Sequence, residues 1–220
     1  MQTVEDAKLL ILQKVPAQAG SRGFPALVEA LIDSVGDMIW KENKWSFAKK
    51  TKAPPEREYI SFVPGTYEYV LDDDFLYPIY VWCKDRGEAG KMDILTQEQL
   101  RNRYPDYTAI TGYPEVCTFE GIRKMQTFGD TAGSIGLIYQ REGGASDLLS
   151  QDKSFLFIII DGVLTMIHKA GSVEEASAFN RFWQRLNAKK QMDASHFEPS
   201  IFIQPDKLFQ QLQTIRRSYQ

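Results

Sequence analysis

The sequence predicts an α+β fold: an antiparallel helical bundle with a β-rich insertion after its second helix and a C-terminal extension. Three observations support this prediction. Apolar residues recur at helical spacing towards both ends of the chain, the middle alternates short aromatic and β-branched runs with Pro, Gly and Asp, and a polar stretch precedes the last apolar segment. We expect residues 1–44 and 146–192 to form the helical core, residues 45–145 the insertion, and residues 193–220 the extension.

Two helices are predicted before the insertion. Thr3 has the side chain of an N-cap, acidic residues follow it in the first turn, and Pro16 ends this helix after about three turns. Pro25 suits the first turn of a second helix. Apolar residues then recur every three or four positions as far as about Glu42, which predicts that this helix packs along one face.

The insertion is predicted to consist of short strands joined by turns. The runs YISFV, TYEYVL, IYVWCK and KMDIL are rich in β-branched and aromatic residues, as are YTAITGY, EVCTFEG, RKMQTF and SIGLIYQ further on. Between the two groups, Thr96 and Gln99 have the spacing of a capping box, which predicts a short helix through Arg103. We expect a meandering antiparallel element over residues 45–140.

Helical character returns after the insertion. Residues 148–169 are apolar nearly all round, which predicts one central helix covered on several sides. Ser172 and Glu175 form a second capping box, and the helix that follows carries one apolar face. The extension contains an apolar strand at Ile201–Ile203 and a final helix with an apolar stripe.

Composition argues against several classes of function. The formal net charge of −3 provides no global basic field for nucleic acid. Cys83 and Cys117 form no CxxC pair, so we expect packing residues rather than a disulfide framework or a zinc knuckle. The longest apolar run is interrupted by Asp161 and Gly162 and is shorter than the roughly 20 residues that a membrane span needs. No dinucleotide, phosphate-loop or metalloprotease motif is present, so we expect no cofactor, no metal and no catalytic residue.

An acidic triplet, Asp72, Asp73 and Asp74, lies between two predicted strands. Paired carboxylates in this position could bind a metal or act in acid and base catalysis, but such sites need a second acidic cluster, a base or a phosphate cradle. The nearby sequence offers none of these. Because Asp commonly ends strands by hydrogen bonding to the backbone, we interpret the triplet as a turn.

A lysine cluster lies where the second helix gives way to the insertion, with Glu42 as its one acidic neighbour. Such a cluster is either a solvated surface or a loop that contacts phosphates without reading the base sequence. The cluster consists of Lys41, Lys44, Lys49, Lys50 and Lys52. We take Lys44, Lys49, Lys50 and Lys52 as candidate contacts to the backbone of DNA.

A series of motifs in a fixed order resembles a known family. The motifs are WKENKWSFA, the strand and turn EYVLDDDF, which is similar to Tyr-x-Leu-Pro-x-Asp-Phe with Asp72 in the place of the proline, then YTAITGY, FLFIIIDGVLTMIHKAG and FNRFWQRLNAKK. Together they extend over residues 24–192. In this order they resemble the head-to-tail adaptor, or connector, proteins of tailed bacteriophages, of the tail tubular protein A and podovirus gatekeeper-like type.

The resemblance implies a structural virion protein. Such adaptors form a ring, typically dodecameric, beneath the portal protein; the ring extends the DNA channel and carries the tail or nozzle protein. It implies synthesis in the host cytoplasm, a final place in the neck between capsid and tail, transient non-specific contact with packaged DNA, and no membrane. We expect the extension to dock on the portal through an apolar stripe. The residues of this stripe are Ile201, Phe202, Ile203, Leu208, Phe209, Leu212 and Ile215.

Two alternative functions come from other classes. A nucleic-acid-binding or regulatory module would use the lysine cluster and would bind duplex DNA in a salt-sensitive way. A carboxylate-dependent cell-wall hydrolase of the virion would use Glu68 or one of Asp72–Asp74 as an acid with a raised pKa near a second carboxylate. We rank the adaptor first, the binding module second and the hydrolase third.

Overall fold

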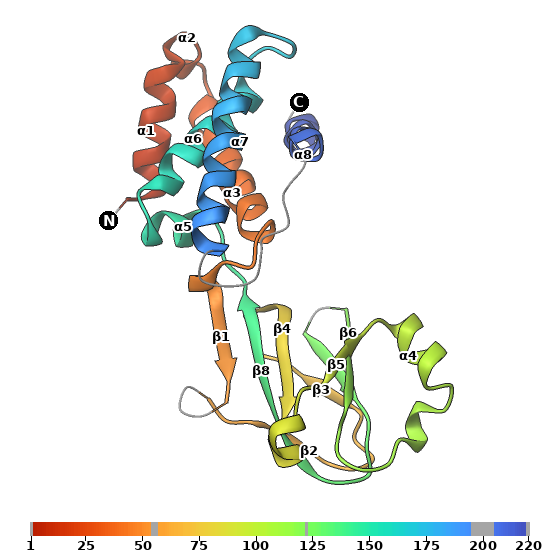
Figure 1. Ribbon diagram of the computed structural model, residues 1–220. Helices are drawn as coiled ribbons and strands as arrows, with labels where there is room; N and C mark the ends of the chain where they lie inside the picture. The colour runs from red at the N-terminus through yellow and green to blue at the C-terminus, as the bar shows by residue number, and fades with distance from the viewer. Residues whose placement is uncertain (1, 54–56, 122, 195–204, 219–220) are drawn as a thin grey trace. The chain divides into compact units, whose positions relative to one another are not determined.

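The computed structural model describes residues 2–53, 57–121, 123–194 and 205–218, and the chain divides into two compact units (Figure 1). The helical unit consists of Met1–Phe47 together with Gly143–Gln220, and the β unit consists of Ala48–Glu142. The predicted α+β class is confirmed, since both helices and strands are present.

Seven helices of the helical unit are described, and one more lies in the β unit. Those of the helical unit are α1 (Val4–Lys14), α2 (Pro16–Ala19), α3 (Phe24–Lys41), α5 (Ala145–Gln151), α6 (Ser154–Ile167), α7 (Val173–Ala194) and α8 (Pro205–Ser218). The β unit contains α4 (Gln97–Arg103). The predicted N-cap at Thr3 and the predicted capping box at Thr96 are confirmed, because each hydroxyl accepts a hydrogen bond from the backbone N–H three residues on.

The apolar segment predicted as one helix over residues 148–169 is instead two helices. The chain breaks between α5 and α6 at Asp152, whose carboxylate accepts a hydrogen bond of 2.7 Å from the backbone N–H of Ser154. The same carboxylate pairs with Lys189 of α7. The prediction failed because hydropathy does not reveal an aspartate whose side chain bonds locally to the backbone and interrupts the helix.

The central position predicted for the apolar helix is confirmed for α6. It packs against α1, α3, α5, α7 and α8, and Figure 1 shows α1, α3 and α7 alongside it. Gly162 explains how closely its neighbours approach. A Cβ there would lie 2.8 Å from Val35 of α3 and 3.1 Å from Phe182 of α7, so any larger residue would force the helices apart.

The β unit contains two four-stranded sheets. Its strands are β1 (Lys49–Lys52), β2 (Ile60–Phe62), β3 (Glu68–Val70), β4 (Phe75–Cys83), β5 (Asp93–Leu95), β6 (Val116–Glu120), β7 (Lys124–Thr127) and β8 (Gly133–Arg141). In one sheet β8 pairs with β1, β2 and β4; in the other the order is β3-β7-β6-β5, with β5 and β6 parallel. The predicted antiparallel meander is therefore wrong in its connections.

Two local predictions within the β unit also change. KKTK was not predicted as a strand, yet β1 pairs with β8 from Lys49 opposite Gln140 to Lys52 opposite Leu137. YTAITGY is not a strand: Tyr107–Ala109 is a short 3-10 helix. The reason is packing, because Tyr107 and Ile110, three residues apart, both pack on the apolar cluster around Phe128.

One apolar core is shared by the two sheets. It includes Phe62 of β2, Leu137 of β8 and Met125 of β7, all almost fully buried. The rings of Phe75 in β4 and Phe119 in β6 stack with centroids 5.5 Å apart, which joins the sheets directly. The sheets therefore form a single packed unit.

The last turn of α7 holds the segment that follows α3. The ammonium of the buried Lys190 donates to the carbonyl oxygen of Glu42, at the C-terminal end of α3. The carboxylate of Asp193 accepts from the backbone N–H of Ser46 at 3.0 Å. Trp45, which lies between Glu42 and Ser46 in the sequence, is fully buried. Its Nε1 donates to the carbonyl of Ile39. Residues distant in sequence thus fix the end of the first helical segment.

Candidate functional site

The acidic triplet forms a turn, as predicted. The backbone N–H of Phe75 donates to the carbonyl of Asp72 at 3.0 Å, and β4 begins immediately after Asp74. The turn differs from a hairpin, however, because β3 and β4 belong to different sheets. The triplet therefore lies where the chain crosses from one sheet to the other.

Two carboxylates of the triplet are paired with the lysine cluster. Lys52 donates to Asp72 at 2.7 Å and Lys50 pairs with Asp74. These lysines lie two residues apart on β1, so both side chains point to the same face of the strand. Asp73 is exposed and lies 3.3 Å from Arg123. Two groups that the sequence analysis treated separately are thus one ionic cluster in the β unit.

Two further residues complete this ionic cluster. The hydroxyl of Tyr139, on β8, lies 3.1 Å from a carboxylate oxygen of Asp72 and 2.8 Å from one of Asp74. Arg57 pairs with Asp72 and also lies 3.3 Å from the Tyr139 hydroxyl. A hydroxyl has one proton to donate, so the two carboxylates share it. No local pattern in the sequence relates Arg57 or Tyr139 to the triplet.

The cluster keeps its carboxylates ionised. Partial burial opposes ionisation of Asp72, but the hydrogen bond and charge of Lys52 outweigh it and lower its pKa. For Asp74, burial is outweighed in the same way by Lys50 and by the Tyr139 hydroxyl, and its pKa is also lowered. Burial and the two carboxylates raise the pKa of Tyr139. A general acid in glycoside hydrolysis needs a raised carboxyl pKa, the opposite of these two shifts.

The ionic cluster includes two of the four lysines predicted to contact phosphates. Of the four candidate lysines, Lys50 and Lys52 are ion-paired with the triplet, which reduces the positive charge they present to a phosphate. Lys44 is exposed and lies in the helical unit, and Lys49 is half-buried in β1. Two of the four candidate lysines are therefore already paired with carboxylates of the β unit.

The thiols and acidic groups of the described residues show no metal site. No group of three or more His, Cys, Asp or Glu side chains within residues 2–53, 57–121, 123–194 and 205–218 is placed to hold a metal ion. Cys83 and Cys117 are buried free thiols, as predicted, and burial raises the pKa of Cys117 to about 12. In the same ranges, no helix is long and apolar enough to span a bilayer.

The candidate portal contacts fall partly on α8. Ile201, Phe202 and Ile203 lie outside the described residues, and the side chains of Leu208 and Phe209 are not described either. Leu212 is fully buried and Ile215 is half-buried. Since α8 packs against α6 and α7, Leu212 is buried against helices of its own chain.

A buried ion pair fastens α8. Arg216 donates to Glu175 at 2.7 Å and also to the carbonyl of His168, while Gln213 donates to Glu175 at 2.8 Å. Glu175 was predicted to form a capping box with Ser172. Its backbone N–H does donate to the Ser172 hydroxyl, but its carboxylate accepts from the backbone N–H of Gly171 rather than from that of Ser172. One carboxylate therefore joins the start of α7 to α8.

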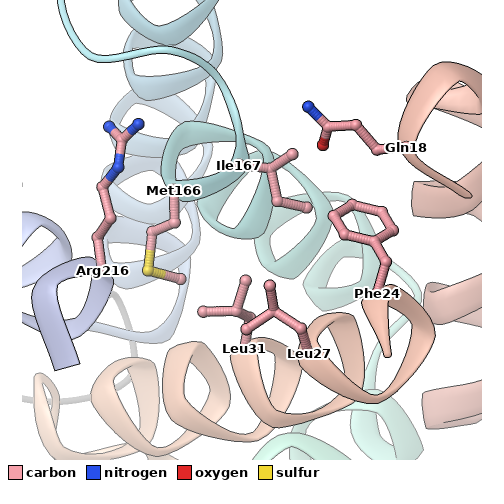
Figure 2. Close-up of a pocket in the computed structure, with 7 residues that line it drawn as sticks. All are labelled: Gln18, Phe24, Leu27, Leu31, Met166, Ile167 and Arg216. Atoms are coloured by element: carbon pink, nitrogen blue, oxygen red, sulfur yellow. The ribbon is translucent and has the colours of Figure 1, made fainter. Parts of the chain in front are cut away.

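A small pocket opens beside this ion pair (Figure 2). Its volume is about 190 Å³, less than the roughly 300 Å³ of small-molecule sites. The side chains lining it come from α2, α3, α6 and α8, and they are Gln18, Phe24, Leu27, Leu31, Met166, Ile167 and Arg216. Five of these seven side chains are apolar, and Arg216 is already bound to Glu175 and to the carbonyl of His168.

A second buried carboxylate, Asp161 in α6, was treated in the sequence analysis only as a break in an apolar run. Its side chain is 5% exposed, and it accepts from Arg181 Nε at 3.1 Å and pairs with Arg185. The signal for this site was present, since an aspartate in an apolar helix requires a cation, and Arg181 and Arg185 are four residues apart on the next helix.

Comparison with known proteins adds no relative: no family model matches the sequence, and no curated protein matches it.

Proposed function

We propose that this chain is a head-to-tail adaptor of a tailed bacteriophage: a structural virion protein that forms a ring under the portal, extends the DNA channel and provides the platform to which the tail attaches. Its place would be the neck of the virion. The partners would be further copies of the chain, the portal protein, and a tail or nozzle protein.

The observation that carries the proposal is the order of elements along the chain. A helical unit is built from the segments before and after a continuous β unit. The motifs that resemble the adaptor family begin at the end of α3 and the segment after it, and continue with the crossing turn, the 3-10 helix Tyr107–Ala109, α6 and α7 in that order. This order supports a helical bundle that carries an inserted β domain. The comparison with known families neither adds to this argument nor opposes it.

Exposed apolar residues on the β unit support a role in assembly. Val70 at the end of β3 is 79% exposed, and Tyr80 and Ile94 also reach the surface. Tyr80 packs on Trp82 with ring centroids 5.7 Å apart, and aromatic residues of this kind are enriched in protein interfaces. We assign these residues to lateral or tail-facing contacts.

The contact with the portal is assigned to α8 and the segment before it. Because Leu212 is fully buried, contact through the apolar stripe requires α8 to leave α6 and α7. The contact with DNA would be weak and non-specific, as sliding requires, and Lys44 is the exposed member of the candidate lysines.

Co-sedimentation with portal rings from the same source tests the proposed function. The protein should pellet with the rings, and electron microscopy of the pellet should show a ring of added density at the tail-facing end of the portal. An intact, monodisperse protein that stays in the supernatant would contradict the adaptor and favour the binding module. Salt-sensitive binding of the isolated protein to duplex DNA would then be the next measurement.

A truncation tests the assignment of α8 separately. Deletion of residues 197–220 should abolish portal binding, while far-UV circular dichroism shows that the remaining helices are retained. A truncated protein that still binds the portal would exclude the C-terminal contact but leave the adaptor function standing.

A further inference from the structure

A basic surface lies on α7 above a buried carboxylate. Arg181 and Arg185 are four residues apart, so they stand one above the other on the helix, and both reach over Asp161. Asp161 is almost inaccessible, whereas the two arginine side chains are nearly half exposed. The carboxylate fixes the guanidinium groups and offsets one of their two charges, which leaves a rigid surface of net positive charge.

An exposed aromatic ring extends this surface. Phe157 of α6 is half-exposed, and the guanidinium of Arg185 lies 5.5 Å from the centre of its ring. Arginine and large aromatic side chains dominate the binding energy of many protein interfaces. Here both are held in place by neighbouring groups, so little side-chain entropy would be lost on docking.

An acidic stripe with the same spacing lies on α3. Glu29, Asp33 and Asp37 follow one another at intervals of four residues, and all three are exposed. Lys8 pairs with Glu29, but neither Asp33 nor Asp37 has a hydrogen bond or ion pair with another residue that the structure describes. Partial burial, and then repulsion from Asp37 and Glu29, raise the pKa of Asp33, so a cation brought to this stripe would relieve an existing repulsion.

We propose that the surface formed by Phe157, Arg181 and Arg185 in one copy of the chain docks on the Asp33 and Asp37 surface of α3 in a second copy. In both helices the charged residues are about 6 Å apart along the axis, because each residue rises about 1.5 Å, so the two pairs of charges can meet simultaneously. This inference rests on the proposed function and deepens it by assigning the lateral contact of the ring.

The geometry makes this contact heterologous. The two surfaces are different and lie on helices that each pack against α6, so every copy carries one of each. A contact between unlike surfaces leaves both ends of a pair unsatisfied, and it closes only when a ring is complete. A two-fold dimer, in contrast, would use one surface twice.

Charge reversal on α3 is the first test. The variant Asp33→Lys with Asp37→Lys changes two exposed side chains that bind no other residue in the described part of the chain, so the fold should be retained. We expect wild-type self-association, followed by sedimentation velocity, to weaken between about 0.05 M and about 0.5 M salt because the charges are screened. The variant should associate at least about tenfold more weakly, since like charges now face each other.

The complementary variant combines Arg181→Glu and Arg185→Glu with Asp161→Asn, so that no buried carboxylate is left without a cation. Asp161→Asn alone is the folding control. The triple variant should also fail to associate by itself. An equimolar mixture with the α3 variant should restore association, because each contact then joins opposite charges again.

Outcomes separate this inference from the proposed function. A wild-type protein that stays monomeric at low salt, an α3 variant that associates like wild type, or a mixture that remains monomeric each overturns the proposed contact. If rings form on portals with the α3 variant, the adaptor stands and the contact is wrong. If the charge-swapped mixture restores association but no form binds portals, the contact stands and the adaptor is wrong.

Discussion

The two units hold their carboxylates in opposite ways. In the helical unit, Asp161 and Glu175 have side chains only 5% and 4% exposed, and each is paired with arginine. In the β unit, Asp72 and Asp74 are 21% and 30% exposed, and lysines are their main partners. The same chemical groups are therefore buried in one unit and left within reach of water in the other.

This difference determines what each ion pair contributes. A buried carboxylate that loses its cation has no water to replace it, so the pair strongly favours the one helix arrangement in which it is satisfied. A half-exposed pair falls back on solvent when it breaks, and typically contributes little. The ion pairs of the helical unit determine how the helices pack. Those of the β unit connect a turn to strand β1 and change the free energy of unfolding little.

The largest effect is expected when Asp161 loses both cations. The double variant Arg181→Ala with Arg185→Ala should lower the free energy of unfolding of the helical unit by about 3–5 kcal/mol, because a buried charge is left unpaired. Urea unfolding followed by far-UV circular dichroism measures it. Adding Asp161→Asn should recover most of the loss; a double variant as stable as wild type would show that Asp161 is not buried in solution.

A smaller effect is expected at the second buried pair. Glu175→Gln keeps the shape but removes the charge that Arg216 faces, and should lower the free energy of unfolding by about 1.5–3 kcal/mol. Hydrogen exchange should show the loss mainly in α8. The neighbouring exposed Glu174→Gln is the matched control and should leave exchange unchanged; equal effects of the two would refute a specific role for Glu175.

In the β unit, removal of the shared hydroxyl should have a modest effect. Tyr139→Phe keeps the buried ring but leaves Asp72 with Lys52 and Arg57, and Asp74 with Lys50. It should lower the free energy of unfolding by about 1 kcal/mol. Exchange of the β1 and β8 amides is the appropriate measurement. A loss as large as that at Asp161 would contradict the distinction between the two units.

The smallest change in stability at neutral pH is expected when Asp72 and Asp74 are replaced, and their contribution is tested through its dependence on pH. Since the folded state lowers the pKa of Asp72 and Asp74, their ionised forms add stability above the unfolded pKa, about 3.9, and this contribution is lost as pH falls through the lower folded values. Replacing both by Asn should flatten the pH dependence of β-unit stability below about pH 5. Asp73→Asn, which removes the exposed carboxylate of the triplet, is the matched control.

Local signals in the sequence predicted the elements well where short-range chemistry decides them. The hydroxyls of Thr3 and Thr96 cap helices as their spacing indicates, and the pattern of α3 matches its buried face. The break at Asp152 was missed because hydropathy does not show that its carboxylate bonds to the backbone of Ser154. The ends of strands are also determined by nearby residues, whereas the pairing of strands depends on residues distant in the sequence.

Long-range pairing explains what the sequence could not predict. The pairing of β8 with three strands joins residues up to about ninety positions apart, and nothing in KKTK shows that it lies beside Tyr139. The triplet was correctly interpreted as a turn, but its connection with Lys50 and Lys52 depends on that sheet. For Asp161 the need for a cation was readable from its apolar surroundings; which cation required the packing of α6 on α7.

The hydrogen bonds from the last turn of α7 to the segment after α3 affect the order in which the chain can fold during synthesis. Residues 48–142 emerge from the ribosome as one continuous stretch and contain every strand of the β unit, so this unit can fold early. Helices α1 and α3 emerge before it, but α6, which covers them, and Lys190 and Asp193, which fix the end of α3, follow it. For most of translation α1 and α3 therefore lack the cover of α6, and a chain that stops before α6 leaves the apolar surface that α6 covers open to aggregation.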